Sequence, residues 1–280
     1  MCARILTGLV GIPLAVVLIF YPGGLPLAAA AGVIAVFGAL EFYGGARGRG
    51  TRPIEWTGLA AALLFVLWAR TSGDAASGLT MRALLMLCLL LAFCVELLRR
   101  NRTPLTDLGV TVFGAVYTGW LISHVVLLRA VEGSVTTWSW TAEAGAWLLM
   151  FVFVCTWACD TCAYFIGKFY GHTKFAPKVS PNKTVEGAVA GFVGAVLAGA
   201  ILGTIINLPA QHSLVMGAII GVFSELGDFS ASAIKRDMGI KDFGQLIPGH
   251  GGILDRFDSV LFSGTAAYYY FALFLQNWPS

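Results

Sequence analysis

Long apolar runs, separated by short polar segments, divide this sequence. A membrane-spanning helix needs about 20 mostly apolar residues to cross the hydrocarbon core of a bilayer. Of the 280 residues, 58% are hydrophobic and 12% are charged, and the mean hydropathy is +0.79. These values are typical of a polytopic membrane protein and exclude a soluble domain. The sequence predicts an all-α bundle of about nine transmembrane helices, near residues 4–21, 25–42, 55–70, 79–98, 106–129, 144–167, 185–207, 211–234 and 256–277.

Basic residues gather on one side of these nine runs. When the connections are assigned alternately from an inside N-terminus, 15 of the 18 Lys and Arg residues fall inside, and only Arg70, Arg82 and Arg129 fall outside. Cytoplasmic loops carry an excess of Lys and Arg, so we expect a cytoplasmic N-terminus and an external C-terminus. The first run makes a poor secretory signal, because Pro13 interrupts it and Arg4 is its single basic residue.

The first polar region lies where the sixth run reaches the cytoplasm. Asp160, Tyr164 and Lys168 recur every four residues and therefore share one face of a helix. An aspartate within a span is costly unless it is paired, bound to a cation or in contact with water. Asp160 is therefore a candidate metal ligand, with an interhelical hydrogen bond as the alternative.

The second region is the basic loop at residues 172–187. Lys183 and Thr184 are expected to open a helix with Glu186 in its first turn, and a helix N-terminus offers unpaired N–H groups that suit phosphate. The alternative is a basic face attracted to anionic lipid, and both hold if the substrate is itself such a lipid. The candidate substrate-binding residues are Lys174, Ser180, Lys183 and Thr184 in this region and Lys168 in the first.

The third region joins the eighth and ninth runs. Glu225, Asp228, Ser232 and Lys235 are three or four residues apart and form one polar stripe on the eighth run. Asp255 and Asp258 likewise share a face at the start of the ninth run, and we expect both to converge with Asp228. Oxygen ligands without a nearby His or Cys pair favour a hard cation such as Mg²⁺, completed by water and substrate phosphates.

The loop between these two runs adds cations and glycines. Its basic residues are Lys235, Arg236, Lys241 and Arg256. The Pro248–Gly252 stretch, with Gly251 and Gly252, lets backbone approach a ligand closely. Metal-holding carboxylates, cationic side chains and a glycine loop are together the parts needed for phosphoryl or nucleotidyl transfer.

These residues resemble the signature of the phosphatidate cytidylyltransferase (CDP-diacylglycerol synthase) family. That signature runs Ser-x-x-Lys-Arg, four residues, Lys-Asp, five residues, Pro-x-His-Gly-Gly, two residues, Asp-Arg-x-Asp. The chain meets it without a change of spacing at Ser232, Lys235, Arg236, Lys241, Asp242, Pro248, His250, Gly251, Gly252, Asp255, Arg256 and Asp258. Upstream elements of the family also occur, as DTCAYFIGKFYG and SPNKTVEG. By motif the resemblance covers residues 143–280, a catalytic membrane region of about four spans, and leaves 1–142 as an N-terminal region of about five spans.

The resemblance implies a reaction and its participants. CTP and phosphatidate would give CDP-diacylglycerol and pyrophosphate, in a homodimeric, Mg²⁺-dependent enzyme of a bacterial-type inner membrane, with its active site facing the cytoplasm and no nucleic-acid partner. A second metal ion is left open. The implied catalytic residues are Asp228, Asp255, Asp258, Lys235, Arg236, Lys241, His250 and Arg256. Asp228, Asp255, Asp258 and Asp160 would be metal ligands, and Ser232, Asp242, Gly251 and Gly252 join the substrate-binding residues of the second region.

Some features depart from the family or leave alternatives. The chain has Asn182 where the family often has Lys, and Glu225 where it commonly has Gln. We expect His250 to donate a hydrogen bond to phosphate or to brace the loop, because a phosphomonoester near neutral pH has little proton left to give to a base. A CTP-dependent polyprenol or phytol kinase is the alternative enzyme, and an ion-coupled transporter is the alternative from another class.

Overall fold

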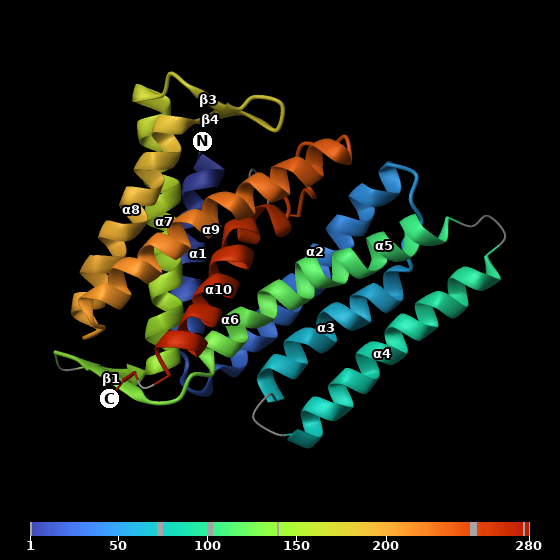
Figure 1. Ribbon diagram of the computed structural model, residues 1–280, viewed down its shortest axis with the longest axis horizontal. Coiled ribbons are helices and arrows are strands. Elements are labelled where there is room, and N and C mark those ends of the chain that lie inside the picture. The colour runs from blue at the N-terminus through green and yellow to red at the C-terminus, as the bar shows by residue number, and fades with distance from the viewer. Residues whose placement is uncertain are drawn as a thin grey trace. The chain divides into compact units, whose positions relative to one another are not determined.

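The computed structural model describes residues 2–71, 75–99, 103–138, 140–246, 251–276 and 278–279, with only the backbone of residues 2–9 and 75–77. The described chain is almost entirely helical (Figure 1). Its α-helices are α1 (Cys2–Phe20), α2 (Leu25–Gly48), α3 (Glu55–Thr71), α4 (Ala75–Leu98), α5 (Pro104–Ala115), α6 (Leu121–Arg129), α7 (Ala144–Tyr170), α8 (Val185–Ile205), α9 (Ala210–Asp237) and α10 (Leu254–Phe274). A short 3₁₀ helix, η1 (Pro22–Gly24), precedes α2. A short π-helix, η2 (Val116–Trp120), joins α5 to α6.

Six segments of the described chain are long and apolar enough to cross a membrane. They are Pro22–Gly48, Gly78–Leu98, Pro104–Arg129, Ala144–Tyr170, Val185–Ile205 and Ala210–Asp237. Helices also cover the other three predicted runs. Of these, α3 has only 17 residues, the part of α1 with described side chains is a shorter apolar helix at Val10–Phe20, and α10 opens with several charged residues. The structure therefore supports a polytopic helical membrane protein with six clear candidate spans.

Two short antiparallel hairpins interrupt the helices, and the sequence analysis did not predict them. One pairs β1 (Ser134–Thr137) with β2 (Trp140–Glu143), directly before α7. The other pairs β3 (Lys174–Ala176) with β4 (Ser180–Thr184), directly after α7. The hairpins therefore lie at opposite ends of α7, as Figure 1 shows. Each is too short to produce a clear alternating pattern in the sequence.

The chain divides into two compact units, described separately below. Unit 1 comprises Met1–Pro13, Gly24–Leu127 and Lys235–Phe257, and unit 2 comprises Leu14–Gly23, Leu128–Ile234 and Asp258–Ser280.

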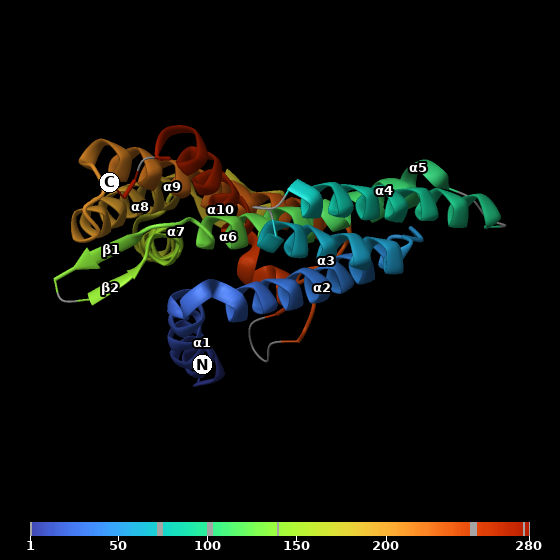
Figure 2. The ribbon, with the colours of Figure 1, turned by 90° about the horizontal axis from the view of Figure 1, so that it is seen from below.

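In unit 1, α3 packs against α2, α4 and α5, and both views show these helices side by side (Figures 1 and 2). Glycines allow the close contacts: Gly58 and Gly114 lie directly against the Tyr43 ring, whose hydroxyl donates to the carbonyl of Thr111 at 2.7 Å.

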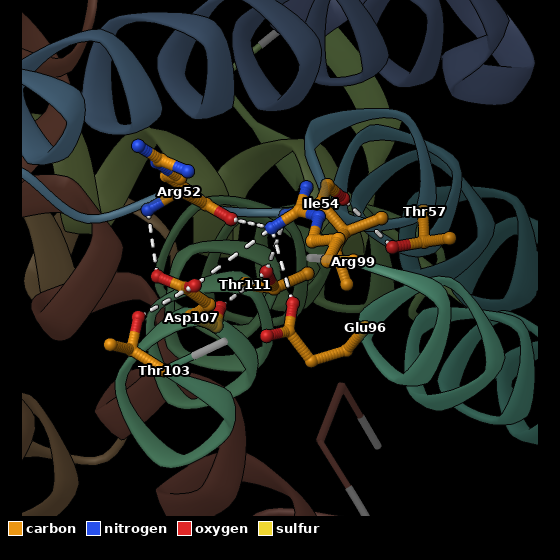
Figure 3. Close-up of polar contacts among 8 residues, drawn as sticks. All are labelled: Arg52, Ile54, Thr57, Glu96, Arg99, Thr103, Asp107 and Thr111. Carbon is orange, nitrogen blue, oxygen red and sulfur yellow. Dashed lines mark hydrogen bonds and ion pairs between the residues drawn. The ribbon is translucent and has the colours of Figure 1, made fainter. Parts of the chain in front are cut away.

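A polar cluster ties together the ends of three helices in unit 1 (Figure 3). The Arg99 guanidinium, at the end of α4, donates to the carboxylate of Glu96 and to the carbonyl of Arg52. The buried Asp107 carboxylate on α5 accepts from the backbone N–H of Arg52 at 2.7 Å and from the hydroxyl of Thr103 at 2.8 Å. These contacts join the segment before α3 to α4 and α5. Because the charges are paired, their burial is tolerated.

In unit 2, α7, α8 and α9 pack through small residues. A Cβ at Gly191 on α8 would lie 3.0 Å from the carbonyl of Cys159 on α7, and one at Gly217 on α9 would lie 3.0 Å from the carbonyl of Ala195 on α8. Such spacings are tighter than ordinary van der Waals contacts of a Cβ, and glycines at these positions let the helices approach closely. Near the beginning of α7, the buried Arg129 guanidinium donates to the carbonyl of Ile19 at 2.7 Å.

Candidate active site

Several of the residues predicted to act on substrate belong to two clusters, one within each unit. The first cluster, in unit 2, is centred on the Lys183 ammonium. Its Nζ lies 2.9 Å from Oε2 of Glu225 and 2.8 Å from Oδ2 of Asp228. The same nitrogen lies 4.1 Å from the centre of the Phe229 ring, a distance at which a cation is attracted to the ring face. Two carboxylates around one lysine leave the Lys183–Glu225–Asp228 cluster with one net negative charge.

The β3–β4 hairpin presents Lys183 to this cluster. β4 ends at Thr184, whose hydroxyl accepts a hydrogen bond from the backbone N–H of Gly187 and so caps the N-terminus of α8. The carboxylate of Glu186, in the first turn of α8, accepts from the backbone N–H of Thr173 at 3.1 Å and anchors the start of the hairpin. Phe175 on β3 packs against Phe229, with ring centres 4.9 Å apart. The expected helix start is confirmed for Thr184, which is the N-cap of α8, whereas Lys183 belongs to β4 and the helix begins at Val185.

Charge pairing keeps Lys183 protonated. Burial of the ammonium acts to lower its pKa, but the neighbouring carboxylates of Asp228 and Glu225 outweigh burial, and the pKa lies above its ordinary value. Because the folded-state pKa is raised, the stability that this pairing contributes is complete below the ordinary lysine pKa. It is lost only as the pH rises through the folded-state value. Lys183 is therefore a fixed cation at neutral pH.

Asp258 on α10 lies beside the part of α9 that carries Asp228. Gly227, next to Asp228 on α9, packs directly against the carbonyl of Asp258 on α10, so closely that a Cβ there would overlap that oxygen. Asp258 is 8% exposed, and its Oδ1 accepts from the backbone N–H of Ser259 at 2.7 Å. Ser232, one turn beyond Asp228, places its hydroxyl 3.5 Å from Oδ1 of Asp228.

The second cluster, in unit 1, is centred on the buried Asp255 carboxylate at the start of α10. Its Oδ1 accepts from Nζ of Lys235 at 2.6 Å. Its Oδ2 accepts from the backbone N–H groups of Phe243 at 2.9 Å and Gly252 at 3.0 Å. Gly251 takes a positive φ of 82°, a conformation that favours glycine, and a Cβ on it would lie 3.0 Å from the Asp255 carboxylate. The cluster thus joins α9, the glycine loop and α10.

A further carboxylate enters this second cluster from far away in the sequence. Glu41 on α2 accepts from the backbone N–H groups of Ile253 at 3.0 Å and Leu254 at 2.9 Å. It is 8% exposed, and the sequence analysis did not identify it. The available signal was a single acidic residue at the end of the apolar run 25–42.

Most of the other predicted residues lie on exposed surface. This holds for Asp160, Lys168, Lys174, Arg236, Lys241, Asp242 and Arg256, and Ser180 is half-buried on β4. Lys168, in the last turn of α7, lies 5.6 Å from the ring centres of Tyr164 and Phe169. The predictions for Pro248 and His250 fall outside the described residues.

The whole chain is similar to proteins of one family. A sequence model of the cytidylyltransferase family matches residues 2–274. The chain belongs to the cytidylyltransferase family. The chain is 33% identical over 290 aligned residues to a phosphatidate cytidylyltransferase of Synechocystis sp., with 97% of each chain covered. It is also 33% identical over 282 aligned residues to one of Bacillus subtilis, again with 97% of each covered. The resemblance seen in the motifs is confirmed.

The predicted metal ligands Asp160, Asp228, Asp255 and Asp258 all lie in the part of the chain that the structure describes. Within the described residues of the chain, no set of three or more His, Cys, Asp or Glu side chains is arranged to hold a metal ion. Both oxygens of Asp255 already accept hydrogen bonds, from an ammonium and from two backbone N–H groups. Asp228 differs, because its side chain stays 36% exposed beside Lys183. It therefore fits a Mg²⁺ ion that is held by one or two carboxylates and completed by water and phosphate oxygens.

Proposed function

We propose that this protein transfers the cytidylyl group of CTP to phosphatidate, giving CDP-diacylglycerol and pyrophosphate in phospholipid biosynthesis. The observation that carries the proposal is its likeness, over 97% of the chain, to two proteins named phosphatidate cytidylyltransferase.

The reaction requires charge neutralisation more than proton transfer. A phosphate oxygen of phosphatidate attacks the α-phosphorus of CTP and forms a new P–O bond. The bond from that phosphorus to the oxygen bridging the β-phosphorus breaks, and its electron pair leaves with pyrophosphate. The second pKa of a phosphomonoester is about 6, so the attacking group is already largely an anion at neutral pH. The protein must align two polyanions and stabilise the charge on the leaving group.

Lysines held by carboxylates fit this task. Lys183 and Lys235 are each fixed by an acidic partner at 2.6–2.9 Å and are therefore preorganised as phosphate donors. The exposed Lys168, Lys174, Arg236, Lys241 and Arg256 add positive charge that attracts CTP and an anionic lipid. Asp228 and Lys235 are seven residues apart on α9, about two helical turns, so one helix contributes to both clusters.

Mg²⁺ is part of this proposal. Asp228 and Asp258 would hold it, on the two helices that meet at Gly227. Asp255 would take part only by releasing one of its protein donors, and Asp160 on α7 is a further predicted ligand. When bound, the ion supplies neutralisation of phosphate charge. The net negative charge of the Lys183–Glu225–Asp228 cluster supports a cation at this position.

The placement in the membrane is proposed from the charge distribution. We propose nine spans, with a cytoplasmic N-terminus and an external C-terminus in a bacterial inner membrane. CTP would arrive from the cytoplasm while phosphatidate stays in the leaflet. A homodimer is proposed from the resemblance alone.

A turnover assay tests the function. The purified protein in detergent is given CTP labelled in the cytosine ring, with phosphatidate, with and without Mg²⁺. We expect a labelled CDP-lipid in the organic phase only when Mg²⁺ is present. Labelled CDP in the aqueous phase together with a polyprenol or phytol acceptor would instead identify a lipid kinase. Absence of any CTP turnover would contradict both enzymes and leave the transporter.

A further inference from the structure

A buried carboxylate from α2 holds the beginning of α10. Oε1 of Glu41 accepts from the N–H of Ile253 and Oε2 from the N–H of Leu254, the first residue of α10. The first N–H groups of a helix have no partner within the helix, and a negative charge there interacts favourably with the helix dipole. Glu41 and Leu254 are 213 positions apart in the sequence, so this cap is a tertiary contact and not a local turn.

Two glycines shape the space around this carboxylate. A Cβ at Gly244 or at Gly252 would overlap the carboxylate of Glu41. Gly244 lies near the middle of the connection between α9 and α10 and Gly252 lies near its end, so two separate segments of this connection pack onto the same side chain. The space is therefore matched to a carboxylate that reaches between two backbone segments.

Asp255 holds the same two segments of the connection from its own side. It accepts from the N–H groups of Phe243 and Gly252, next to the residues that contact Glu41. Four backbone N–H groups, those of Phe243, Gly252, Ile253 and Leu254, thus donate to two carboxylates. The other oxygen of Asp255 then receives the Lys235 ammonium at 2.6 Å.

These contacts connect Glu41 to the Lys235 ammonium, a predicted phosphate-binding cation. Glu41 fixes Ile253 and Leu254, these fix the first turn of α10, and that turn fixes Asp255 and through it Lys235. A glutamate in an apolar helix is costly unless its charge is satisfied, so a helix with only a packing role would be better served by an apolar residue.

We propose that Glu41 is a positioning residue for cytidylyl transfer, which sets Asp255 and, through it, the phosphate-binding ammonium of Lys235 by anchoring the segments at Gly244 and at Gly252–Leu254. This inference rests on the proposed function. Two acceptor oxygens are required, because Ile253 and Leu254 donate to different oxygens of the carboxylate. A glutamine offers one acceptor and one NH₂ donor, so Glu41→Gln turns a donor toward one of the two N–H groups.

The test compares Glu41→Gln with a matched control, Glu96→Gln. Glu96 is also a buried glutamate of unit 1, but it pairs with Arg99 in the polar cluster of Figure 3 and does not contact the loop. For each variant we would measure the melting temperature, the kcat and KM for CTP, and the hydrogen exchange of the backbone amides of residues 251–254. In Glu41→Gln we expect kcat to fall about 100-fold, as for an active site misplaced by about 1 Å, with faster exchange at 251–254. In Glu96→Gln we expect a lower melting temperature with kcat within about twofold of wild type and unchanged exchange at 251–254.

Clear outcomes overturn the inference. A Glu41→Gln protein with wild-type kcat, or an equal loss of kcat in Glu96→Gln, would reduce Glu41 to a contributor to stability. If Glu41→Gln cannot be purified folded, Glu41→Asp replaces it, since it keeps the charge but is one methylene too short, and wild-type kcat in that variant overturns the inference as well. If the wild-type protein makes no CDP-lipid, the proposed function fails, while the exchange measurement still decides whether Glu41 anchors the loop.

Discussion

At the scale of single residues, Asp228 keeps an exposed carboxylate surface while it pairs with Lys183. We predict that Asp228→Asn lowers kcat by at least about 100-fold, because the change removes a metal ligand and half of the charge around Lys183. The measurement is turnover of labelled CTP at saturating phosphatidate. The control is Asp237→Asn, also on α9, whose side chain is 80% exposed in a loose pair with Arg49 and should not affect turnover. Near-normal turnover of Asp228→Asn would remove Asp228 from the proposed metal site.

Glu225 also pairs with Lys183, and we expect it to compete with a substrate phosphate for this ammonium. Its Oε2 lies 2.9 Å from Nζ, and Glu225→Gln keeps an acceptor there but removes one negative charge. We predict that kcat is retained, because Asp228 still holds Lys183, and that KM for CTP falls by about threefold, as expected for a weakened ion pair worth up to about 1 kcal/mol. Initial rates measured over a range of CTP and Mg²⁺ concentrations give kcat and the KM for CTP. A tenfold rise in the Mg²⁺ needed for half-maximal rate would instead place Glu225 in the metal shell.

At the scale of the elements, the contact between α9 and α10 depends on Gly227. A Cβ there would overlap the carbonyl of Asp258, so we predict that Gly227→Ala costs about 1–3 kcal/mol of unfolding free energy and lowers kcat by shifting Asp228 and Asp258. The matched control is Gly109→Ala in α5, where a Cβ meets nothing within 4 Å and should add about 0.5–1 kcal/mol of stability. Thermal unfolding in detergent shows which of the two variants is less stable. Equal stability of both would contradict the close contact.

The elements also show what local sequence pattern can predict. The apolar runs predicted every long helix, and spacing on α9 placed Glu225 and Asp228 on one face, where both meet Lys183. The pattern did not predict that the backbone N–H groups of Phe243 and Gly252 would donate to the Asp255 carboxylate. Every residue except proline has such an N–H group, so the residue types do not reveal which ones donate. It also did not predict Glu41 at the same loop, since that contact joins residues 212 positions apart and depends on tertiary packing.

At the scale of the whole molecule, the distribution of basic residues predicts which side of the membrane each connection occupies. α7 has 27 residues and is therefore about 40 Å long, more than the hydrocarbon core of about 30 Å. Its two ends carry the two hairpins, and Lys174, Lys178 and Lys183 all belong to the connection after it. The basic hairpin should therefore be cytoplasmic and the β1–β2 hairpin external.

Labelling of single cysteines tests this orientation. We predict that, in a variant whose six native cysteines are replaced, Lys178→Cys reacts with a membrane-impermeant maleimide only after cells are permeabilised. Thr136→Cys on β1, exposed like Lys178, should react in intact spheroplasts. The cysteine-free parent must first retain CTP turnover, so that labelling reports on an active protein. The reverse pattern would invert the proposed topology and place the Lys183–Glu225–Asp228 cluster away from cytoplasmic CTP. Labelling of both positions from one side would mean that α7 does not cross the membrane.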